Sequence, residues 1–305
     1  MITETPEGYL RFMSFEINAR TVLLGLLGHP VAHSVSPYLQ NKLAEACGLN
    51  QRYLAFDIAD EEALEDAVWG GHAMGVKGFN VTVPYKKAVM EYLEETDPIA
   101  KKIGAVNTLK WEETGWHGYN TDMPGLLRAL AYDGVEIKGK KVVLIGAGGA
   151  ANATLCAALE GGAAQVLILN RTVSKAEELA EQFSKEYPFI PIRCMGMGDE
   201  FVSYLDTYGN DWIALQTTSV GMHPDVNGLP VSDDAFYDHL SVGYDIIFNP
   251  KETAFMKKAK AHGGKAFNGL RMLLFQGIRS YEIWNDVTIS DEIAGEILKG
   301  MELAV

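Results

Sequence analysis

Short apolar runs alternate with amphipathic segments along the first part of the chain, a pattern typical of strands alternating with helices. Ser36 followed by Pro37 indicates a helix N-cap with proline at the first helical position. Asp60 and its acidic neighbours open a helix that reaches about Trp69, and Pro84 begins a further helix. The strands predicted here cover residues 21–27, 53–58 and 78–83, followed by a hairpin of residues 107–111 and 116–119.

The same alternation restarts after residue 123. A helix is expected over residues 149–160, Ser174 caps the next one, and two helices close the chain, over residues 270–284 and from the N-cap Ser290 to Met301. The strands predicted in this part cover residues 141–145, 166–169, 212–216, 243–248 and 265–267. An α/β fold with mostly parallel sheets follows, and 305 residues favour two domains divided near residue 123.

Composition narrows the class of protein. A hydrophobic content of 48% with 22% charged residues describes an ordinary soluble globular protein. No apolar run approaches the roughly 18 residues that a membrane span requires, and residues 1–20 show no export signal. Three scattered cysteines without a CxxC pair fit a reducing cytoplasm, and the seven histidines are not spaced as metal ligands. The formal charge of −14 disfavours nucleic acid and anionic membrane as partners, so an anionic ligand would need local cations and backbone N–H groups.

Five polar side chains lie in three short stretches, FNVTVPYK, AVNTL and GYNTD, at or just past apolar segments. Each could simply end a strand or cap a helix. Open α/β sheets, however, place their ligand-facing residues just beyond the carboxyl ends of strands. Their amide, hydroxyl, ammonium and carboxylate groups together predict a site that holds a polyhydroxylated molecule and moves a proton on it. These residues are Asn80, Thr82, Lys86, Asn107 and Asp122.

A glycine-rich turn follows the predicted strand 141–145 and satisfies the pattern G-x-G-x-x-A. Its first glycine permits a tight turn, the second lets backbone N–H groups approach a pyrophosphate, and the small last residue allows close packing of helix on strand. The helix N-terminus then supplies partial positive charge to the phosphates. The turn, a predicted dinucleotide site, consists of Gly146, Ala147, Gly148, Gly149, Ala150 and Ala151.

The end of the next strand decides which dinucleotide binds. An NAD site places an acidic residue there for the ribose 2′-hydroxyl. This chain instead has Asn170, Arg171 and Thr172, with Lys175 one turn later. Arg171 can fork across a 2′-phosphate and Lys175 adds a point charge, although both could be solvated surface charges. We therefore expect NADP, with NAD as a possible secondary cofactor.

Together these motifs resemble those of the shikimate dehydrogenase family over nearly the whole chain. The resemblance implies reversible, NADP-linked interconversion of 3-dehydroshikimate and shikimate in aromatic amino acid biosynthesis. It also implies a substrate-binding and catalytic domain over residues 21–123 after an extension of residues 1–20, a Rossmann domain over 124–268, and helices over 269–305 that return to the first domain. The matching stretches are GHPVAHSVSP, FNVTVPYK, GAVNTL, GYNTD, GAGGAA, NRTVSKA, TTSVGM, YDIIFNPKET and NGLRMLLFQG.

Carried over by position, the resemblance assigns roles to individual residues. Ser34, Ser36 and Tyr244 would receive the substrate carboxylate, and Asn80, Thr82, Asn107 and Gln276 would bind the ring hydroxyls. Lys86 and Asp122 would form the acid–base dyad, in which the lysine donates a proton as the hydride reaches the carbonyl carbon and the carboxylate orients it. The loop beside the nicotinamide would consist of Thr218, Ser219, Val220, Gly221 and Met222.

Two departures keep alternatives open. Gln40 stands where many members have histidine, and Asn152 stands where a basic residue is frequent after the glycine turn. Gln40 is also typical of dual quinate/shikimate dehydrogenases, which are less strict about cofactor, whereas the retained Ser36 and Thr82 favour shikimate. A non-catalytic ligand sensor and a folate-linked dehydrogenase are further readings, which the Lys86–Asp122 pair and the small polar site respectively disfavour. Monomer and homodimer both remain possible.

Overall fold

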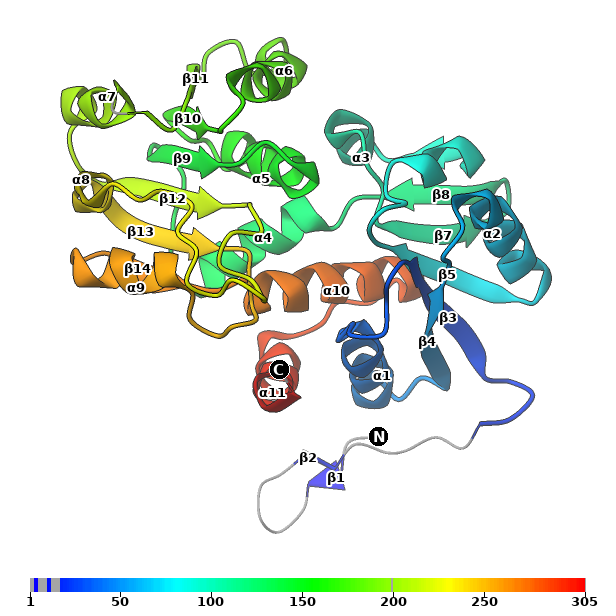
Figure 1. Cartoon of the computed structure of the whole chain (residues 1–305). Helices are drawn as coiled ribbons and strands as arrows, with labels where there is room; N and C mark the ends of the chain where they lie inside the picture. Colours follow the sequence, from blue (N-terminus) through cyan, green and yellow to red (C-terminus); the bar gives the residue numbers. More distant parts are fainter. Residues whose placement is uncertain (1–2, 5–9, 12–16, 199, 305) are drawn as a thin grey trace. The chain divides into compact units, whose positions relative to one another are not determined.

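The computed structural model describes residues 3–4, 10–11, 17–198 and 200–304. Its contacts divide the chain into two compact units, the first comprising Met1–Thr121 with Leu274–Ala304 and the second Asp122–Leu273 (Figure 1). Of the expected extension over residues 1–20, most lies outside the described residues. Its described part includes the short antiparallel pair β1 (Thr3–Glu4) and β2 (Leu10–Arg11).

A mixed six-stranded sheet forms the centre of the first unit, in the order β4-β3-β5-β7-β8-β6. The strand β3 pairs in parallel with β4 and β5, and the predicted hairpin is present as the antiparallel pair β7 and β8. The antiparallel β7 explains why the sheet is mixed, because a hairpin reverses the chain direction. The strands are β3 (Val22–Gly28), β4 (Gln51–Asp57), β5 (Val76–Val81), β6 (Glu95–Thr96), β7 (Thr108–Glu112) and β8 (Gly115–Tyr119).

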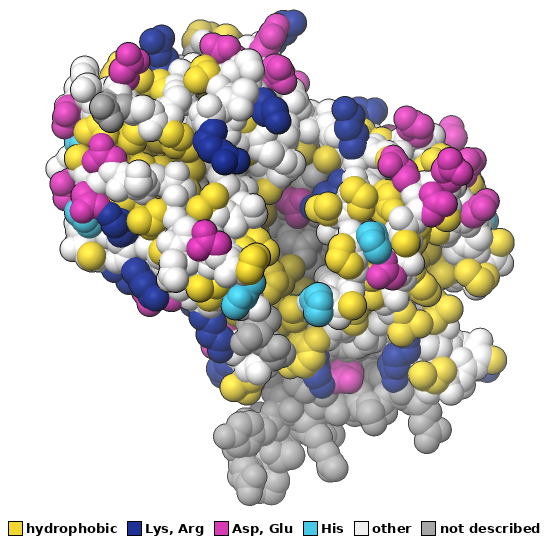
Figure 2. All heavy atoms as spheres, viewed as in Figure 1, with side chains coloured by type: hydrophobic (Ala, Val, Ile, Leu, Met, Phe, Trp, Pro, Cys, Tyr) yellow, Lys and Arg dark blue, Asp and Glu magenta, His cyan; other side chains and the backbone are white. Residues whose placement is uncertain are grey.

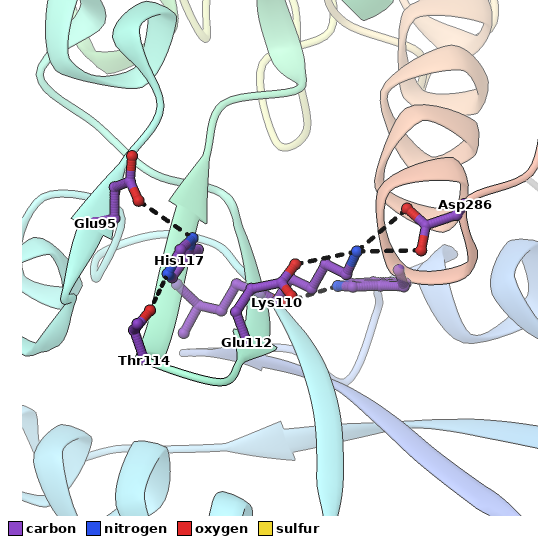
Figure 3. Close-up of polar contacts among 8 residues, drawn as sticks. Glu95, Lys110, Glu112, Thr114, His117 and Asp286 are labelled. Carbon is purple, nitrogen blue, oxygen red and sulfur yellow. Dashed lines mark hydrogen bonds and ion pairs between the residues drawn. The ribbon is translucent and has the colours of Figure 1, made fainter.

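Helices cover both faces of this sheet. The apolar side chains Leu64 and Val68 of α2 pack against Phe79 and Val81, whereas Trp284 of α10 packs with Leu24 on the other face. Figure 3 shows how the end of α10 is attached to β7: Lys110 lies between Glu112 and Asp286, at 3.1 Å and 3.3 Å. The helices of this unit are α1 (Ser36–Cys47), η1 (Glu61–Ala63), α2 (Leu64–Ala73), η2 (Ala88–Tyr92), α3 (Pro98–Ile103), α10 (Leu270–Asn285), whose first four residues belong to the second unit, and α11 (Asp291–Ala304).

Two expected helix starts in this unit are wrong, whereas those at Asp60 and Ser290 are confirmed. Ser36 is the first helical residue of α1 rather than its cap, because Val35 already has right-handed helical backbone angles. No helix begins at Pro84; the chain turns there and the 3-10 helix η2 starts only at Ala88. Ser290 does cap α11, since its hydroxyl accepts a hydrogen bond from the backbone N–H of Ile293 at 3.3 Å.

The second unit contains a six-stranded sheet in the order β11-β10-β9-β12-β13-β14, with every pairing parallel. Because helices flank both faces of such a sheet, its inner strands are buried on both sides and read as continuous apolar runs; Val142 to Ile145 are all fully buried. The strands are β9 (Lys141–Ile145), β10 (Gln165–Leu169), β11 (Ile192–Met195), β12 (Trp212–Gln216), β13 (Leu240–Asp245) and β14 (Lys265–Phe267).

Two expectations for this unit need correction. Strand β13 begins and ends three residues earlier than the predicted 243–248. Ser174 is the second residue of α6, and the cap position is Thr172 without a side-chain bond to the helix. The helices of the unit are α4 (Asp122–Tyr132), α5 (Gly149–Glu160), α6 (Val173–Ser184), α7 (Glu200–Tyr208), α8 (Asp234–Asp238) and α9 (Ala254–Ala261).

Two features that bear on function are absent from the described residues. None of their helices is both long enough and apolar enough to cross a membrane. The same residues contain no group of three or more His, Cys, Asp or Glu side chains arranged to hold a metal ion.

Candidate active site

A hydrogen-bonded group of polar side chains joins the ends of β5 and β8 to the start of β7 in the first unit. The Asn107 side chain donates to Thr121 Oγ1 at 3.0 Å and accepts from the Thr121 backbone N–H at 2.9 Å. Its backbone carbonyl accepts from the Val81 N–H at 2.9 Å. We call this group the amide cluster. It consists of Asn80, Asn107, Thr108, Thr121, Gln276 and Ser280.

Both polar atoms of the Asn80 side chain form hydrogen bonds with other residues of the first unit. Its carbonyl oxygen accepts from the Tyr53 hydroxyl at 2.8 Å, and its amide nitrogen lies within 3.1 Å of Asn107 O, Thr108 Oγ1 and Ser280 Oγ. The residue is 6% exposed. In this conformation Asn80 supports Asn107, and its expected contact with a ring hydroxyl stays a prediction.

Helix α10 brings two residues to the amide cluster. Thr121 Oγ1 lies 3.5 Å from Gln276 Oε1, and Ser280 Oγ lies 2.8 Å from Thr108 Oγ1 and 3.2 Å from Thr121 Oγ1. Gln276 was expected from the sequence, whereas Ser280, Thr108 and Thr121 were not. The spacing of Gln276 and Ser280 was an available signal, because residues four apart share one face of a helix.

Lys86 lies in the turn after β5, half-buried. Its backbone carbonyl accepts a hydrogen bond from the N–H of Val106 at 2.7 Å, which fixes the turn to the residue before Asn107. The buried Tyr85 fixes the same turn as well, because its hydroxyl donates a hydrogen bond to the carbonyl of Ile58 at 2.5 Å. The backbone at Lys86 is thus attached to the residue that precedes Asn107 of the amide cluster.

Asp122, the expected partner of Lys86, follows Thr121 and is the first residue of α4. A carboxylate in the first turn of a helix meets the unpaired backbone N–H groups there, which favour negative charge. The chain itself therefore places Asp122 next to a member of the amide cluster.

The loop before α1 contains the two serines expected to receive a carboxylate. Ser34 Oγ accepts from the backbone N–H of Ser36 at 3.2 Å, and both serines are half-buried. Burial raises the pKa of Tyr53 well above its ordinary value, a rise that a hydrogen bond with Ser36 reduces. Because the Tyr53 hydroxyl also donates to Asn80, Ser36 is connected to the amide cluster through Tyr53.

The start of the same loop contains a hydrogen bond between a histidine and a carboxylate. His29 Nδ1 and Asp57 Oδ1, at the ends of β3 and β4, lie 2.6 Å apart, with each side chain 46% exposed. The backbone N–H of His29 donates to the carbonyl of Val83 at 3.0 Å, so this loop is attached to the turn that contains Thr82 and Lys86.

In the second unit the glycine turn lies between β9 and α5. Gly146 has a φ of +105°, and a Cβ there would lie 2.8 Å from Thr217 Oγ1, so both conformation and space require glycine. A Cβ at Gly148 or Gly149 would meet no protein atom within 4 Å. Open space at these exposed glycines, at the N-terminus of α5, suits the close approach of a phosphate. Ala151 is fully buried, as close helix–strand packing requires.

Strands β10 and β12 flank β9, so the segments that follow them lie at the same edge of the sheet as the glycine turn. After β10, Asn170 Nδ2 donates to the Thr172 carbonyl at 2.8 Å, and Arg171 and Lys175 are exposed. After β12, the Thr217 hydroxyl donates to the Ile145 carbonyl at 2.8 Å and binds that loop to the end of β9. The three segments expected to bind the nucleotide are therefore neighbours in space.

Charge is unevenly distributed over the visible face of the molecule. Figure 2 shows acidic side chains gathered over η1 and α2, where Glu61, Glu62, Glu65 and Asp66 are exposed. Lys and Arg side chains are also visible around α5 and α6 of the second unit, together with acidic ones. Arg171 and Lys175 are exposed after β10, and they are local cations of the kind that an anionic ligand requires in a protein of net charge −14.

Tyr244, expected to contact the substrate, is fully buried inside the second unit. It lies in β13, its ring packs 6.4 Å from that of Phe267, and burial raises the pKa of its hydroxyl. A side chain without exposed surface cannot reach a ligand in this conformation. Burial in this conformation thus disfavours Tyr244 as a substrate contact, and its ring contributes to the core of the second unit.

The second unit defines the class of protein. Counted along the chain from β9, its strands have the order 3-2-1-4-5-6, with the glycine-rich turn after the first strand. This is the arrangement of a Rossmann-type dinucleotide-binding fold, which binds its ligand where the strand order reverses, here between β9 and β12.

Comparisons with known proteins identify the family. Residues 26–109 match the model for the shikimate dehydrogenase substrate-binding domain, and residues 129–197 that for shikimate/quinate 5-dehydrogenase. A shikimate dehydrogenase (NADP(+)) of Carboxydothermus hydrogenoformans is 42% identical over 89% of this chain and 94% of its own. The chain belongs to the shikimate dehydrogenase family.

Solved structures agree with this assignment. A shikimate dehydrogenase in complex with NADP+ is 37% identical and superposes with a TM-score of 0.83, covering 94% of this chain and 97% of the other. The shikimate 5-dehydrogenase of Listeria monocytogenes, in complex with shikimate and NAD, is 31% identical with a TM-score of 0.85, covering 94% and 99%. The α/β fold with a Rossmann-type unit, predicted from the sequence, is confirmed.

Proposed function

We propose that this protein catalyses the reversible, NADPH-dependent reduction of 3-dehydroshikimate to shikimate. The observation that carries the proposal is the amide cluster, which adjoins Lys86 through Val106 and Asp122 through Thr121. Amides and hydroxyls offer both donors and acceptors, which suits a ring with several hydroxyl groups. Asn107 and Gln276 are the members that we assign to this role, and Thr121, which has no exposed surface, positions Asn107.

We assign the acid–base step to Lys86. When bound, NADPH supplies the hydride to the carbonyl carbon of the substrate. The Lys86 ammonium donates a proton to the carbonyl oxygen as negative charge develops there, and the neutral amine accepts it in the reverse direction. Asp122 is assigned to orient the Lys86 amine for this transfer.

Serine hydroxyls receive the substrate carboxylate in this proposal. Ser34 and Ser36 lie at the start of α1, where hydroxyls and backbone N–H groups bind an anion without a full positive charge. Together with Thr82 they leave less room for the additional C1 hydroxyl of quinate, so shikimate is the preferred substrate and quinate a secondary one.

The nucleotide is assigned to the second unit. Backbone N–H groups after Gly146 and at the start of α5 hold the pyrophosphate, and the loop of Thr218 to Met222 lies beside the nicotinamide. The exposed Arg171 and Lys175 bind the 2′-phosphate, which makes NADP the preferred cofactor.

One assay tests the whole proposal. The purified protein is mixed with shikimate or quinate, each with NADP+ or NAD+, and reduction is followed at the nicotinamide absorbance. We expect the highest kcat/KM for shikimate with NADP+. Nucleotide and shikimate binding without turnover would identify a ligand sensor instead, and equal kcat/KM for the two nucleotides would contradict the role of Arg171.

A further inference from the structure

The side chain of Gln216, the last residue of β12, shapes the loop that follows it. Its Nε2 donates to the carbonyl oxygens of Thr218 at 3.1 Å and Val220 at 3.2 Å, and its Oε1 accepts from the backbone N–H of Thr218. Gln216 is fully buried. One carboxamide therefore sets the path of the loop proposed to lie beside the nicotinamide.

Gln216 is in turn held by the carboxylate of Asp245. The two residues are register partners in the parallel pair β12 and β13, and Gln216 Nε2 lies 3.3 Å from Asp245 Oδ1. The same oxygen accepts from the backbone N–H of Ile247 at 3.0 Å, and Oδ2 accepts from the hydroxyl of Thr253 at 2.7 Å. Asp245 is thus bonded both to the loop after its own strand and, through Gln216, to the loop after β12.

Thr253 closes this network. Its hydroxyl accepts from the backbone N–H of Met256 and so caps α9, at 3.3 Å. A Cβ built on Gly221 would lie 3.6 Å from Thr253 Cβ, so the far end of the β12 loop rests against this residue. A carboxylate is suited to the centre of this network, because an ionised carboxyl group only accepts hydrogen bonds. Asp245 accepts from three donors, on Gln216, Ile247 and Thr253.

We propose that Asp245 is a positioning residue for the cofactor site, which fixes the loops after β12 and β13 together by acting through Gln216. The proposal rests on the proposed function, in which the β12 loop lies beside the nicotinamide. Asp245 has no exposed surface, so its effect on the nucleotide is transmitted by the loops and not by contact.

The test compares three variants with the wild type. Asp245→Ala removes the acceptor of three hydrogen bonds, and we expect it to weaken NADPH binding, measured by nucleotide fluorescence, by roughly 10- to 100-fold. The KM for NADP+ should rise while the KM for shikimate stays unchanged. Asp245→Asn should recover most of the affinity, since its oxygen can serve Gln216 and Ile247 while its amide donates to a rotated Thr253 hydroxyl. Gln216→Ala should repeat the loss, and it replaces Asp245→Ala should that variant not fold.

Ser241→Ala is the matched control, because Ser241 bonds to the carbonyl of Trp212 at 3.2 Å and joins the same two strands at their opposite ends. It should leave NADPH affinity unchanged. Wild-type affinity in Asp245→Ala, or an equal loss in Ser241→Ala, would overturn the proposal.

Hydrogen exchange separates this result from a failure of the proposed function. In the protein without nucleotide, the backbone amides of residues 218–222 should exchange faster in Asp245→Ala than in the wild type. Unchanged exchange would overturn the positioning role, whatever the enzyme assay shows. Wild-type protein that neither binds NADPH nor oxidises shikimate would instead refute the proposed function.

Discussion

Asp133, directly after α4, forms an ion pair with Arg271 in the first turn of α10, with Oδ1 and Nη1 2.7 Å apart. The carboxylate side chain is only 3% exposed. Burial raises the pKa of Asp133 to about 6, against the lowering effect of the Arg271 charge. The pair thus connects the ends of two helices through a carboxyl group that titrates close to neutral pH.

This pKa predicts a specific dependence of stability on pH. The folded pKa lies above the ordinary value of about 3.9, so between roughly pH 4 and 6 the folded state binds more protons than the unfolded state. The Asp133 contribution to the free energy of unfolding therefore falls as the pH rises through this window. The asparagine in Asp133→Asn does not titrate, so this contribution is absent from the variant. Between pH 4 and pH 7 the free energy of unfolding of the variant should therefore rise by about 1–3 kcal/mol relative to that of the wild type.

Urea denaturation of both proteins at several pH values measures this difference. Other titrating groups, among them Asp245, are present in both proteins and cancel in the comparison. Parallel curves of unfolding free energy against pH would show that Asp133 titrates normally.

Lys86→Ala should lower kcat by roughly two or more orders of magnitude, because general acid–base catalysis commonly contributes about 10²–10⁴-fold. Lys87→Ala is the matched control, since the neighbouring lysine is exposed and has no assigned role. Circular dichroism and the Tm of both variants should match the wild type. Turnover near the wild-type rate in Lys86→Ala would remove this lysine from the mechanism.

The glycine turn could be predicted from the sequence because its requirements are local. A φ of +105° at Gly146 and a buried small residue at Ala151 are properties of a few consecutive residues. The expectation of a helix from Pro84 was wrong because the conformation there involves a contact that is not local. There the carbonyl of Lys86 bonds to Val106, a residue distant in sequence, and this tertiary contact accompanies a turn where a helix was expected.

The direction of a strand side chain is equally hard to predict. Successive residues of a strand face opposite sides, and only packing decides which side holds a ligand. Asn80 and Tyr244 were therefore expected in contact with substrate, although the first bonds internally and the second is buried. Ser280 was missed because its role depends on the register of α10 against β7.

Arg171→Ala should change cofactor preference with little effect on stability. Losing a charge-assisted contact with the 2′-phosphate should lower kcat/KM for NADP+ by roughly 10- to 100-fold, while kcat/KM for NAD+ changes little. Steady-state kinetics with both nucleotides measures the ratio. Arg193→Ala, an exposed arginine on β11, is the control and should keep the wild-type ratio. An equal decrease for NADP+ and NAD+ would place Arg171 elsewhere than at the 2′-phosphate.

Asn80→Ala should affect folding more than substrate recognition. The change removes an acceptor for the Tyr53 hydroxyl and a donor to the carbonyl of Asn107, and leaves both partners buried. The Asn107 carbonyl keeps its bond from Val81 and the Tyr53 hydroxyl its bond with Ser36, so each lost hydrogen bond costs about 0.5–1.5 kcal/mol. The free energy of unfolding should therefore fall by about 1–3 kcal/mol. Where the variant remains folded, the KM for shikimate should rise only to the extent that Asn107 shifts. A variant with the wild-type Tm and a KM raised more than about tenfold would mean that Asn80 binds the substrate itself, as the sequence alone had indicated.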